Sequence, residues 1–144
     1  MKLLIINGPN LNMLGIREPE IYGSRTYNNL IEMISAHCAE NGVDADFYQS
    51  NHEGCLVDRI QQAYGNTDGI VINPGAYTHT SVAILDAVKT MGIPTVEVHI
   101  SDPDEREEFR HTSYIRLACI ATVKGKGFEG YLEAVDTLIK HVGK

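Results

Sequence analysis

A glutamate and a histidine stand two residues apart at the end of a short apolar run. If this run is a β-strand, Glu97, His99 and Ser101 leave one face together, while Val96 and Val98 occupy the other face. A carboxylate beside an imidazole orients the ring and favours its protonated form, which a general acid near neutral pH requires. The pattern predicts His99 as a proton donor and Glu97 as its orienting residue, with a purely structural carboxylate as the alternative for Glu97.

A second set of polar residues lies in the segment 8–25, which is longer than the roughly two to six residues usual between a strand and a helix. Its length is typical of an active-site lid. Arg17 and Arg25 could bind an anion in a chain that is acidic overall. A guanidinium beside a phenol favours the phenolate, so Tyr22 is a candidate general base. Ordinary packing is the alternative interpretation of this tyrosine.

These residues are set among short apolar runs that alternate with segments of helical periodicity. The predicted strands are 2–7, 43–48, 69–73, 95–99 and 118–123. Four of them are nearly continuous in apolar residues, as buried parallel strands are, but Asp44 and Asp46 alternate with apolar residues as in an edge strand. Helical stripes occupy 27–38, 56–64, 82–91 and 131–142. Gly42 is placed to end the first helix, and Ser50 with Glu53 has the spacing of a capping box for the second.

Right-handed crossovers convert this order into one doubly wound parallel sheet. We expect a single α/β domain over residues 1–144, with the flavodoxin-like strand order 2-1-3-4-5. Ligands of such sheets bind beyond the carboxyl ends of the strands, here where the first, third and fourth strands end at Asn7, Asn73 and His99. Turn formation explains any one of the loops that follow, but three neighbouring polar loops favour a site.

Composition and charge exclude several classes of protein. The chain has 144 residues, 43% of them hydrophobic and 22% charged, which fits a compact globular domain. A net charge of −7 argues against nucleic acid and anionic membranes as partners. The three cysteines lack CxxC spacing and the sequence shows no metal-ligand cluster, so we expect no metal. The first apolar run has only four residues, which predicts a cytoplasmic protein without a membrane segment. The motif GxGxxG at 125–130 lacks the second βα unit of a dinucleotide site.

Five stretches of the chain resemble the type II 3-dehydroquinate dehydratases. They are 7–23, 50–54, 72–81, 97–101 and 106–114, and they follow the family's order and spacing. The resemblance implies a hydro-lyase that removes water from 3-dehydroquinate to give 3-dehydroshikimate, a step toward chorismate and the aromatic amino acids. It also implies anti elimination through an enolate, with neither metal nor organic cofactor.

The resemblance further implies a role for each matched catalytic residue. Tyr22 would take the proton from the carbon next to the ketone, and Arg17 would promote the ionisation of Tyr22. His99 would protonate the departing hydroxyl group. Asn10 would hold a water molecule that stabilises the enolate.

Substrate-binding residues follow from the same resemblance. Asn73 and the backbone N–H groups of Ile100 and Ser101 would bind the substrate carboxylate, and His79 and Arg110 would bind its ring hydroxyls. Family members assemble from trimers into dodecamers, so we expect a homo-oligomer here.

Two further positions concern this assembly and the edge of the site. Asp86 would reach the site of a neighbouring subunit. The segment 102–105 departs from the family, because Asp-Pro-Asp-Glu stands where Asn and an apolar residue are usual. Asp102 followed by Pro103 is typical of the first residues of a short helix.

Two other classes of function fit the same residues. One is a non-catalytic flavodoxin-like module that binds flavin or a protein partner, with Tyr22 and Tyr77 as ring-stacking residues. The other is a cofactor-free isomerase or lyase that acts on a different polyhydroxy carboxylate or sugar with the same acid and base.

Overall fold

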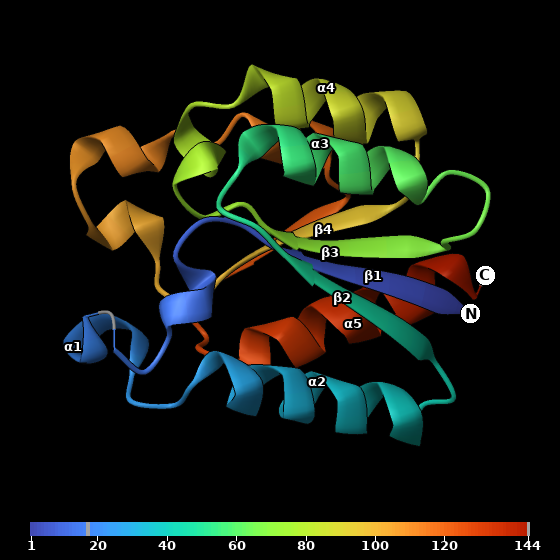
Figure 1. The fold of residues 1–144 in the computed structure, drawn as a ribbon, viewed down its shortest axis with the longest axis horizontal. Coiled ribbons are helices and arrows are strands. Elements are labelled where there is room, and N and C mark those ends of the chain that lie inside the picture. Colours follow the sequence, from blue (N-terminus) through green and yellow to red (C-terminus); the bar gives the residue numbers. More distant parts are fainter. Residues whose placement is uncertain (17, 144) are drawn as a thin grey trace.

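The computed structural model describes residues 1–16 and 18–143. Its sheet is parallel throughout, with the order β2-β1-β3-β4-β5, so the predicted flavodoxin-like topology is confirmed (Figure 1). The strands are β1 (Lys2–Asn7), β2 (Asp44–Gln49), β3 (Gly69–Asn73), β4 (Thr95–His99) and β5 (Ala121–Lys124). The helices are α1 (Pro19–Tyr22), α2 (Tyr27–Glu40), α3 (Glu53–Gln62), α4 (Val82–Met91) and α5 (Glu129–Val142).

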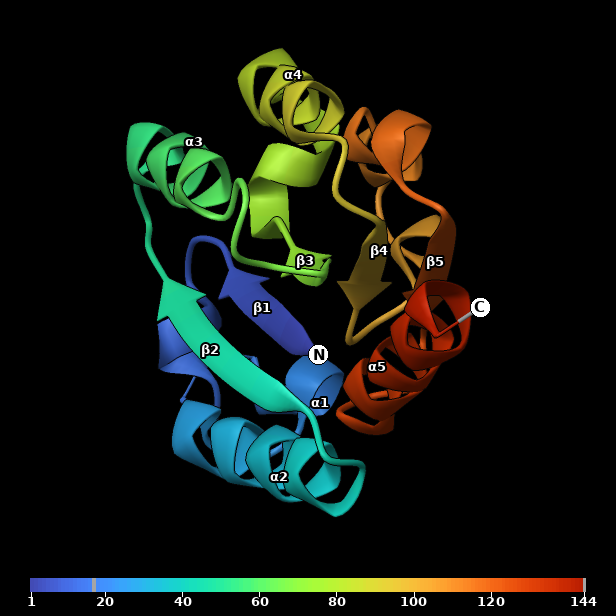
Figure 2. The same ribbon diagram turned by 90° about the vertical axis from the view of Figure 1, so that its right-hand side faces the viewer.

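Helices cover both faces of the sheet, with α3 and α4 on one face and α2 and α5 on the other (Figure 2). The position of β1 inside the sheet explains why its sequence is continuously apolar. Leu3 and Ile5 pack into the cluster on the α2 and α5 side, whereas Leu4 and Ile6 pack into the cluster beneath α3 and α4. Successive residues of a strand point to opposite faces, and helices cover both faces of this sheet. All four side chains are therefore fully buried. None of the helices within the described residues is long and apolar enough to cross a membrane.

Strand β2 lies at the edge of the sheet, as its alternating sequence predicts. Most of its residues are only partly buried. Asp46 forms ion pairs with Lys2 at 3.0 Å and with Arg59 of α3 at 3.6 Å. Charged side chains of this kind protect an edge strand against pairing with another sheet.

Two local predictions were wrong. The fifth strand begins at Ala121 rather than at residue 118, because Ile115–Ala118 forms a 3₁₀ turn. Ser50 does not cap α3: its hydroxyl accepts from the N–H of His52, one residue short of the helix. The capping box is found at α2 instead, where Thr26 and Asn29 exchange side chain–backbone hydrogen bonds. Asparagine in place of the usual Glu or Gln hides this pattern in the sequence.

Candidate active site

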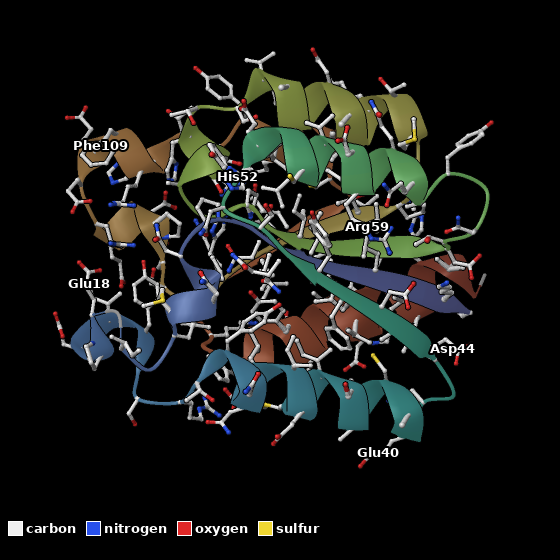
Figure 3. The ribbon with its side chains drawn as sticks, viewed as in Figure 1. Glu18, Glu40, Asp44, His52, Arg59 and Phe109 are labelled. Carbon is white, nitrogen blue, oxygen red and sulfur yellow. The ribbon has the colours of Figure 1, made fainter. Side chains whose placement is uncertain are left out.

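A small cavity lies beyond the carboxyl ends of β1, β3 and β4. In Figure 1 the loops that follow these strands lie at the end of the molecule opposite both termini. Its volume is about 40 Å³. Glu18 and Phe109, which belong to loops around this site, lie at the same end (Figure 3). The lining residues are Leu11, Tyr22, Asn73, Gly75, Ala76, His79, His99, Ile100, Ser101, Pro103, Arg106 and Arg110. The predicted position at the switch point of the sheet is therefore where the cavity lies.

The loops after β1 and β3 touch each other at Gly8. Its N–H donates to the carbonyl of Asn73 at 2.8 Å. A Cβ on Gly8 would lie 2.3 Å from the carbonyl oxygen of Pro74, so no larger residue fits without displacing the backbone. This close contact places the two loops beside the same cavity.

A buried hydrogen-bond chain sets the orientation of Asn73. The Tyr131 hydroxyl donates to Asn7 Oδ1 at 2.6 Å and accepts from Asn73 Nδ2 at 2.9 Å. Asn73 Oδ1 in turn accepts from the N–H of Gly75 at 3.1 Å. Tyr131 is completely buried, which raises the pKa of its phenol and keeps the hydroxyl protonated. Asn73 therefore retains one amide N–H for a ligand.

Glu97 and His99 lie side by side, as the strand alternation predicts. Glu97 Oε2 is 3.2 Å from His99 Nε2, and the carboxylate is fully buried. Burial alone would raise the pKa of Glu97, but contacts from His99, Ser113 and Arg116 outweigh it and hold this pKa below its usual value. The carboxylate is therefore ionised. Because Nε2 faces Glu97, the His99 ring nitrogen left for the cavity is Nδ1.

The contacts of His79 define the tautomer and the charge of its ring. Its Nδ1 lies 2.7 Å from the carbonyl oxygen of Thr112, which can only accept, so Nδ1 carries the proton. Burial lowers the pKa of His79, and the charges of His99 and Arg110 lower it further. The ring is therefore neutral at neutral pH, and Nε2 is a hydrogen-bond acceptor.

Arg106 is a site residue that the sequence analysis missed. Its Nη1 donates to the Tyr22 hydroxyl at 2.7 Å, and its Nη2 lies 3.7 Å from the Glu18 carboxylate. The guanidinium carbon also lies 5.5 Å from the centre of the Tyr22 ring. The sequence did contain a signal for Arg106, because this residue begins the stretch 106–114 that resembles the dehydratase family. Arg17, the predicted partner of Tyr22, lies outside the described residues.

The loop after β4 is held by the glycine-rich turn at 125–127. The carbonyl of Ile100 accepts from the N–H of Gly127 at 3.1 Å, and that of Ser101 accepts from Gly125 at 3.2 Å. Both glycines have positive φ, which gives this turn its shape. Because the C=O and N–H of a planar trans peptide point in opposite directions, the bond to the Ile100 carbonyl directs the N–H of Ser101 away from Gly127. The glycine-rich turn at 125–127 therefore holds the loop that forms one wall of the cavity.

Two of the acidic residues that depart from the family pattern, Asp102 and Asp104, pair with one lysine. Asp102 caps a short 3₁₀ turn by accepting from the N–H of Asp104 at 3.0 Å, with Pro103 in its first position, as the sequence indicates. Lys124 of β5 lies 3.8 Å from Asp102 and contacts Asp104 directly. The hydrogen bond from Lys124 lowers the pKa of the Asp104 carboxyl group.

Asn10, Asp86 and Arg25 do not line this cavity, and neither do Glu97, which contacts His99, and Tyr77. Asn10 lies in the loop after β1, where its N–H donates to Asn51 Oδ1 at 3.0 Å. Asp86 lies on the exposed side of α4. Arg25 stacks on Phe128 at 4.3 Å and lies 3.6 Å from the Glu129 carboxylate, so it is no part of the cavity.

The electrostatic character of the cavity differs from that of the whole chain. Two guanidinium groups, of Arg106 and Arg110, line it together with two imidazoles, whereas the chain has a net charge of −7. Among residues 1–16 and 18–143, no group of three or more His, Cys, Asp or Glu is arranged to hold a metal ion. The arrangement suits a small organic anion that exchanges protons with a phenol and an imidazole.

The fold and site together define a flavodoxin-like α/β enzyme whose site lies at the switch point of its sheet. The model of the class II dehydroquinase family matches residues 1–139. The chain belongs to this family, and it is accordingly a hydro-lyase.

Curated relatives and solved structures agree with this assignment. The 3-dehydroquinate dehydratase of Corynebacterium glutamicum is 56% identical over 137 residues, which are 95% of this chain and 94% of the relative. That of Caldicellulosiruptor saccharolyticus is 54% identical over 143 residues, 99% of each chain. The crystal structure of type II dehydroquinase from Butyrivibrio crossotus has a TM-score of 0.95 at 54% identity, covering 96% of this chain and 97% of that one.

Proposed function

We propose that the protein converts 3-dehydroquinate to 3-dehydroshikimate by anti elimination of water through an enolate, in the pathway toward chorismate. The observation that carries this proposal is the convergence of Tyr22, His99 and Arg106 on one cavity. Removal of a proton next to a ketone creates enolate charge, and the loss of a hydroxyl group needs an acid. A base and an acid on separate loops can serve these two steps.

Tyr22 is the proposed base. Its phenolate would take the proton from the carbon beside the ketone, leaving an enolate. Arg106, at 2.7 Å from the hydroxyl, places a positive charge beside the oxygen that would carry the proton away. Arg17 would act in the same way, and Asn10 would hold a water molecule against the enolate oxygen.

His99 is the proposed acid. Its protonated ring would donate a proton to the departing hydroxyl group, which leaves as water while the enolate collapses to the conjugated enone. Glu97, 3.2 Å from Nε2, would orient the ring. This arrangement directs Nδ1 toward the substrate.

The substrate carboxylate would be bound at the wall formed by Asn73, Ile100 and Ser101. The remaining Asn73 amide N–H and two backbone N–H groups match the acceptors of a carboxylate. His79, as an acceptor, and Arg110, as a donor, are suited to the ring hydroxyls.

The cavity has room for a few water molecules rather than for a cyclic acid, since it measures about 40 Å³. An open hollow of about 490 Å³ adjoins it and shares Tyr22, Ile100, Ser101 and Arg106 with it. Tyr22 and Arg106 line both spaces, so we expect entry of the substrate to displace the part of the chain that carries Tyr22. Such movement is the function expected of a lid.

We also propose a homododecamer built of trimers, in which Asp86 contributes to a neighbouring site. Asp86 is exposed on α4 and lies outside its own chain's cavity, which leaves it available to a second subunit. Light scattering should give a mass near twelve times the 15.9 kDa of one chain. A monomer would contradict this proposal.

Ultraviolet absorbance of the conjugated enone tests the reaction. Purified protein is added to 3-dehydroquinate with a chelator present, and the absorbance should rise in proportion to enzyme. Tyr22→Phe should abolish the rise while retaining binding of a carboxylate inhibitor. Near-normal turnover by Tyr22→Phe would exclude Tyr22 as the base.

The same assay separates the alternatives. A folded, oligomeric protein with no turnover would contradict the proposed substrate, and competition by other polyhydroxy carboxylates would then identify the lyase or isomerase alternative. The flavin alternative is disfavoured by Tyr77, whose hydroxyl donates to the Asn51 carbonyl at 2.9 Å and whose ring packs against the core. Flavin bound to the purified protein would favour it nonetheless.

A further inference from the structure

The buried carboxylate of Glu97 has two partners besides His99, and both come from the irregular segment that follows the site. The Ser113 hydroxyl donates to Glu97 Oε1 at 2.5 Å. Arg116 donates to Oε2 from Nε at 3.3 Å and from Nη2 at 3.2 Å. Oε2 is also the atom that faces His99, so Arg116 and His99 share one carboxylate oxygen.

The segment that carries these partners is fixed in place. The N–H of Arg116 donates to the Ser113 hydroxyl at 3.2 Å, which links the two residues in one turn. The N–H of Tyr114 donates to the Thr78 carbonyl at 3.0 Å, and Ile115 is fully buried in the core beneath α3 and α4. Arg116 is therefore held against Glu97 by the fold, although its side chain is 37% exposed.

The proposed reaction would remove the positive charge that lies beside Glu97. When His99 gives its proton to the leaving hydroxyl group, the imidazolium becomes a neutral imidazole. Glu97 then loses its positive neighbour while it remains fully buried. A buried carboxylate without a cation tends to take up a proton, and a protonated Glu97 would no longer favour recharging of His99.

We propose that Arg116 is a positioning residue for the general acid: it keeps Glu97 ionised and oriented toward His99 throughout the catalytic cycle. This inference rests on the proposed function and names a residue outside the substrate cavity. Arg116 is suited to the role because a guanidinium does not lose its charge at working pH. Its Nε and Nη2 also both reach Oε2, which restricts rotation of the carboxylate.

The other titratable groups around Glu97 do not supply a permanent charge. His79 of the loop after β3 is neutral at neutral pH, since burial lowers its pKa. Burial and the Glu97 charge raise the pKa of Cys119 to about 12, so this thiol is also uncharged. Ser113 is a neutral donor. Among these described neighbours, Arg116 is the cation whose charge does not change during turnover.

The test is to replace Arg116 and follow kcat, KM and their pH dependence with 3-dehydroquinate. Arg116→Gln should lower kcat roughly tenfold, a part of the contribution of a general acid, while KM changes by less than about twofold. Because removal of a cation raises the pKa of a nearby carboxyl group, the acid limb of kcat should move to higher pH. Arg116→Lys should restore most of kcat and the pH profile.

A double-mutant cycle shows whether Arg116 acts through Glu97. In a Glu97→Gln background, Arg116→Gln should cause no further loss of kcat in single-turnover measurements. An equal loss in both backgrounds would overturn the proposal, because it would show a role independent of Glu97.

Arg59→Gln is the matched control. Arg59 also pairs with a carboxylate, that of Asp46 at 3.6 Å, and the change removes the same charge. It lies well away from Glu18 and Phe109, which mark the end of the molecule that carries the site (Figure 3). This variant should keep wild-type kcat and pH dependence.

Failure of this inference and failure of the proposed function are distinguishable. Wild-type turnover together with unchanged kcat and pH profile in Arg116→Gln would overturn the role of Arg116 alone. Absence of wild-type turnover would overturn the function and this role with it. If Arg116→Gln does not fold, Arg116→Lys decides the matter: kcat and a pH profile near wild type support a role for the charge, and a loss in a folded Lys variant contradicts it.

Discussion

Arg106 Nη1 donates a hydrogen bond to the Tyr22 hydroxyl at 2.7 Å, which joins two loops 84 residues apart in sequence across the mouth of the cavity. The guanidinium therefore directly contacts the oxygen atom of the proposed base. Both side chains line the small cavity and also the open hollow beside it. We therefore expect this one pair of side chains to affect both the proposed base and access to the cavity.

Replacing Arg106 should damage turnover more than folding. We expect Arg106→Ala to lower kcat by about a hundredfold, the effect typical of losing one preorganised electrostatic partner, because Tyr22 loses a cation 2.7 Å away. Steady-state kinetics with 3-dehydroquinate checks this. Arg25→Ala removes a guanidinium from segment 8–25 that stacks on Phe128 instead, and it should turn over normally. Equal activity in the two variants would refute the role of Arg106.

Tyr131→Phe should affect both stability and substrate binding. It leaves Asn7 Oδ1 and Asn73 Nδ2 without their buried partner, so we expect a loss of about 1–3 kcal/mol in the free energy of unfolding. KM should rise because the amide of Asn73 is no longer held. Denaturant unfolding and kinetics measure the two effects, and Tyr64→Phe, at a residue 72% exposed, is the control. Stability and KM equal to the wild-type values would show that the chain of hydrogen bonds is dispensable.

Gly8→Ala should disturb the contact between the loops after β1 and β3. The new Cβ would lie 2.3 Å from the Pro74 carbonyl oxygen, and relieving this clash should destabilise the protein by about 1–3 kcal/mol. Activity should fall with it, since both loops border the site. The control is Gly54→Ala in α3, where a Cβ meets nothing within 4 Å. That change should stabilise the helix by roughly 0.5–1 kcal/mol, so the two variants are expected to move thermal midpoints in opposite directions.

His79 should make the protein less stable as the pH falls through 6.5. Its pKa is lowered in the folded protein, so below pH 6.5 the unfolded chain binds a proton that the folded chain does not. Stability is therefore fully present above the unfolded pKa and declines until the folded pKa is passed. His79→Asn keeps a donor for the Thr112 carbonyl and removes the titration. The free energy of unfolding, measured from pH 7.5 downward, should fall less steeply in this variant, and parallel curves would contradict the prediction.

Much of the fold follows from local patterns in the sequence. Continuous apolar runs correctly predict β1, β3 and β4, because a strand covered on both faces has no solvent-facing side. The charged alternation of β2 predicts an edge for the same reason. Placement of the site also follows, since the carboxyl ends of parallel strands meet at one side of the sheet. Tyr22, His99 and Asn73 could be selected on this basis before their distances were known.

The tertiary structure alone decided what surrounds these residues. Arg106 and Arg116 lie in an irregular segment between β4 and β5, where no periodicity indicates which side chains turn inward. Tyr131 reads as an ordinary apolar residue of α5, although its hydroxyl joins β1 to β3. Periodicity reports which face of an element is buried, because burial repeats along a helix or strand. Contacts between irregular loops depend on where the whole chain brings them, and that information is not local.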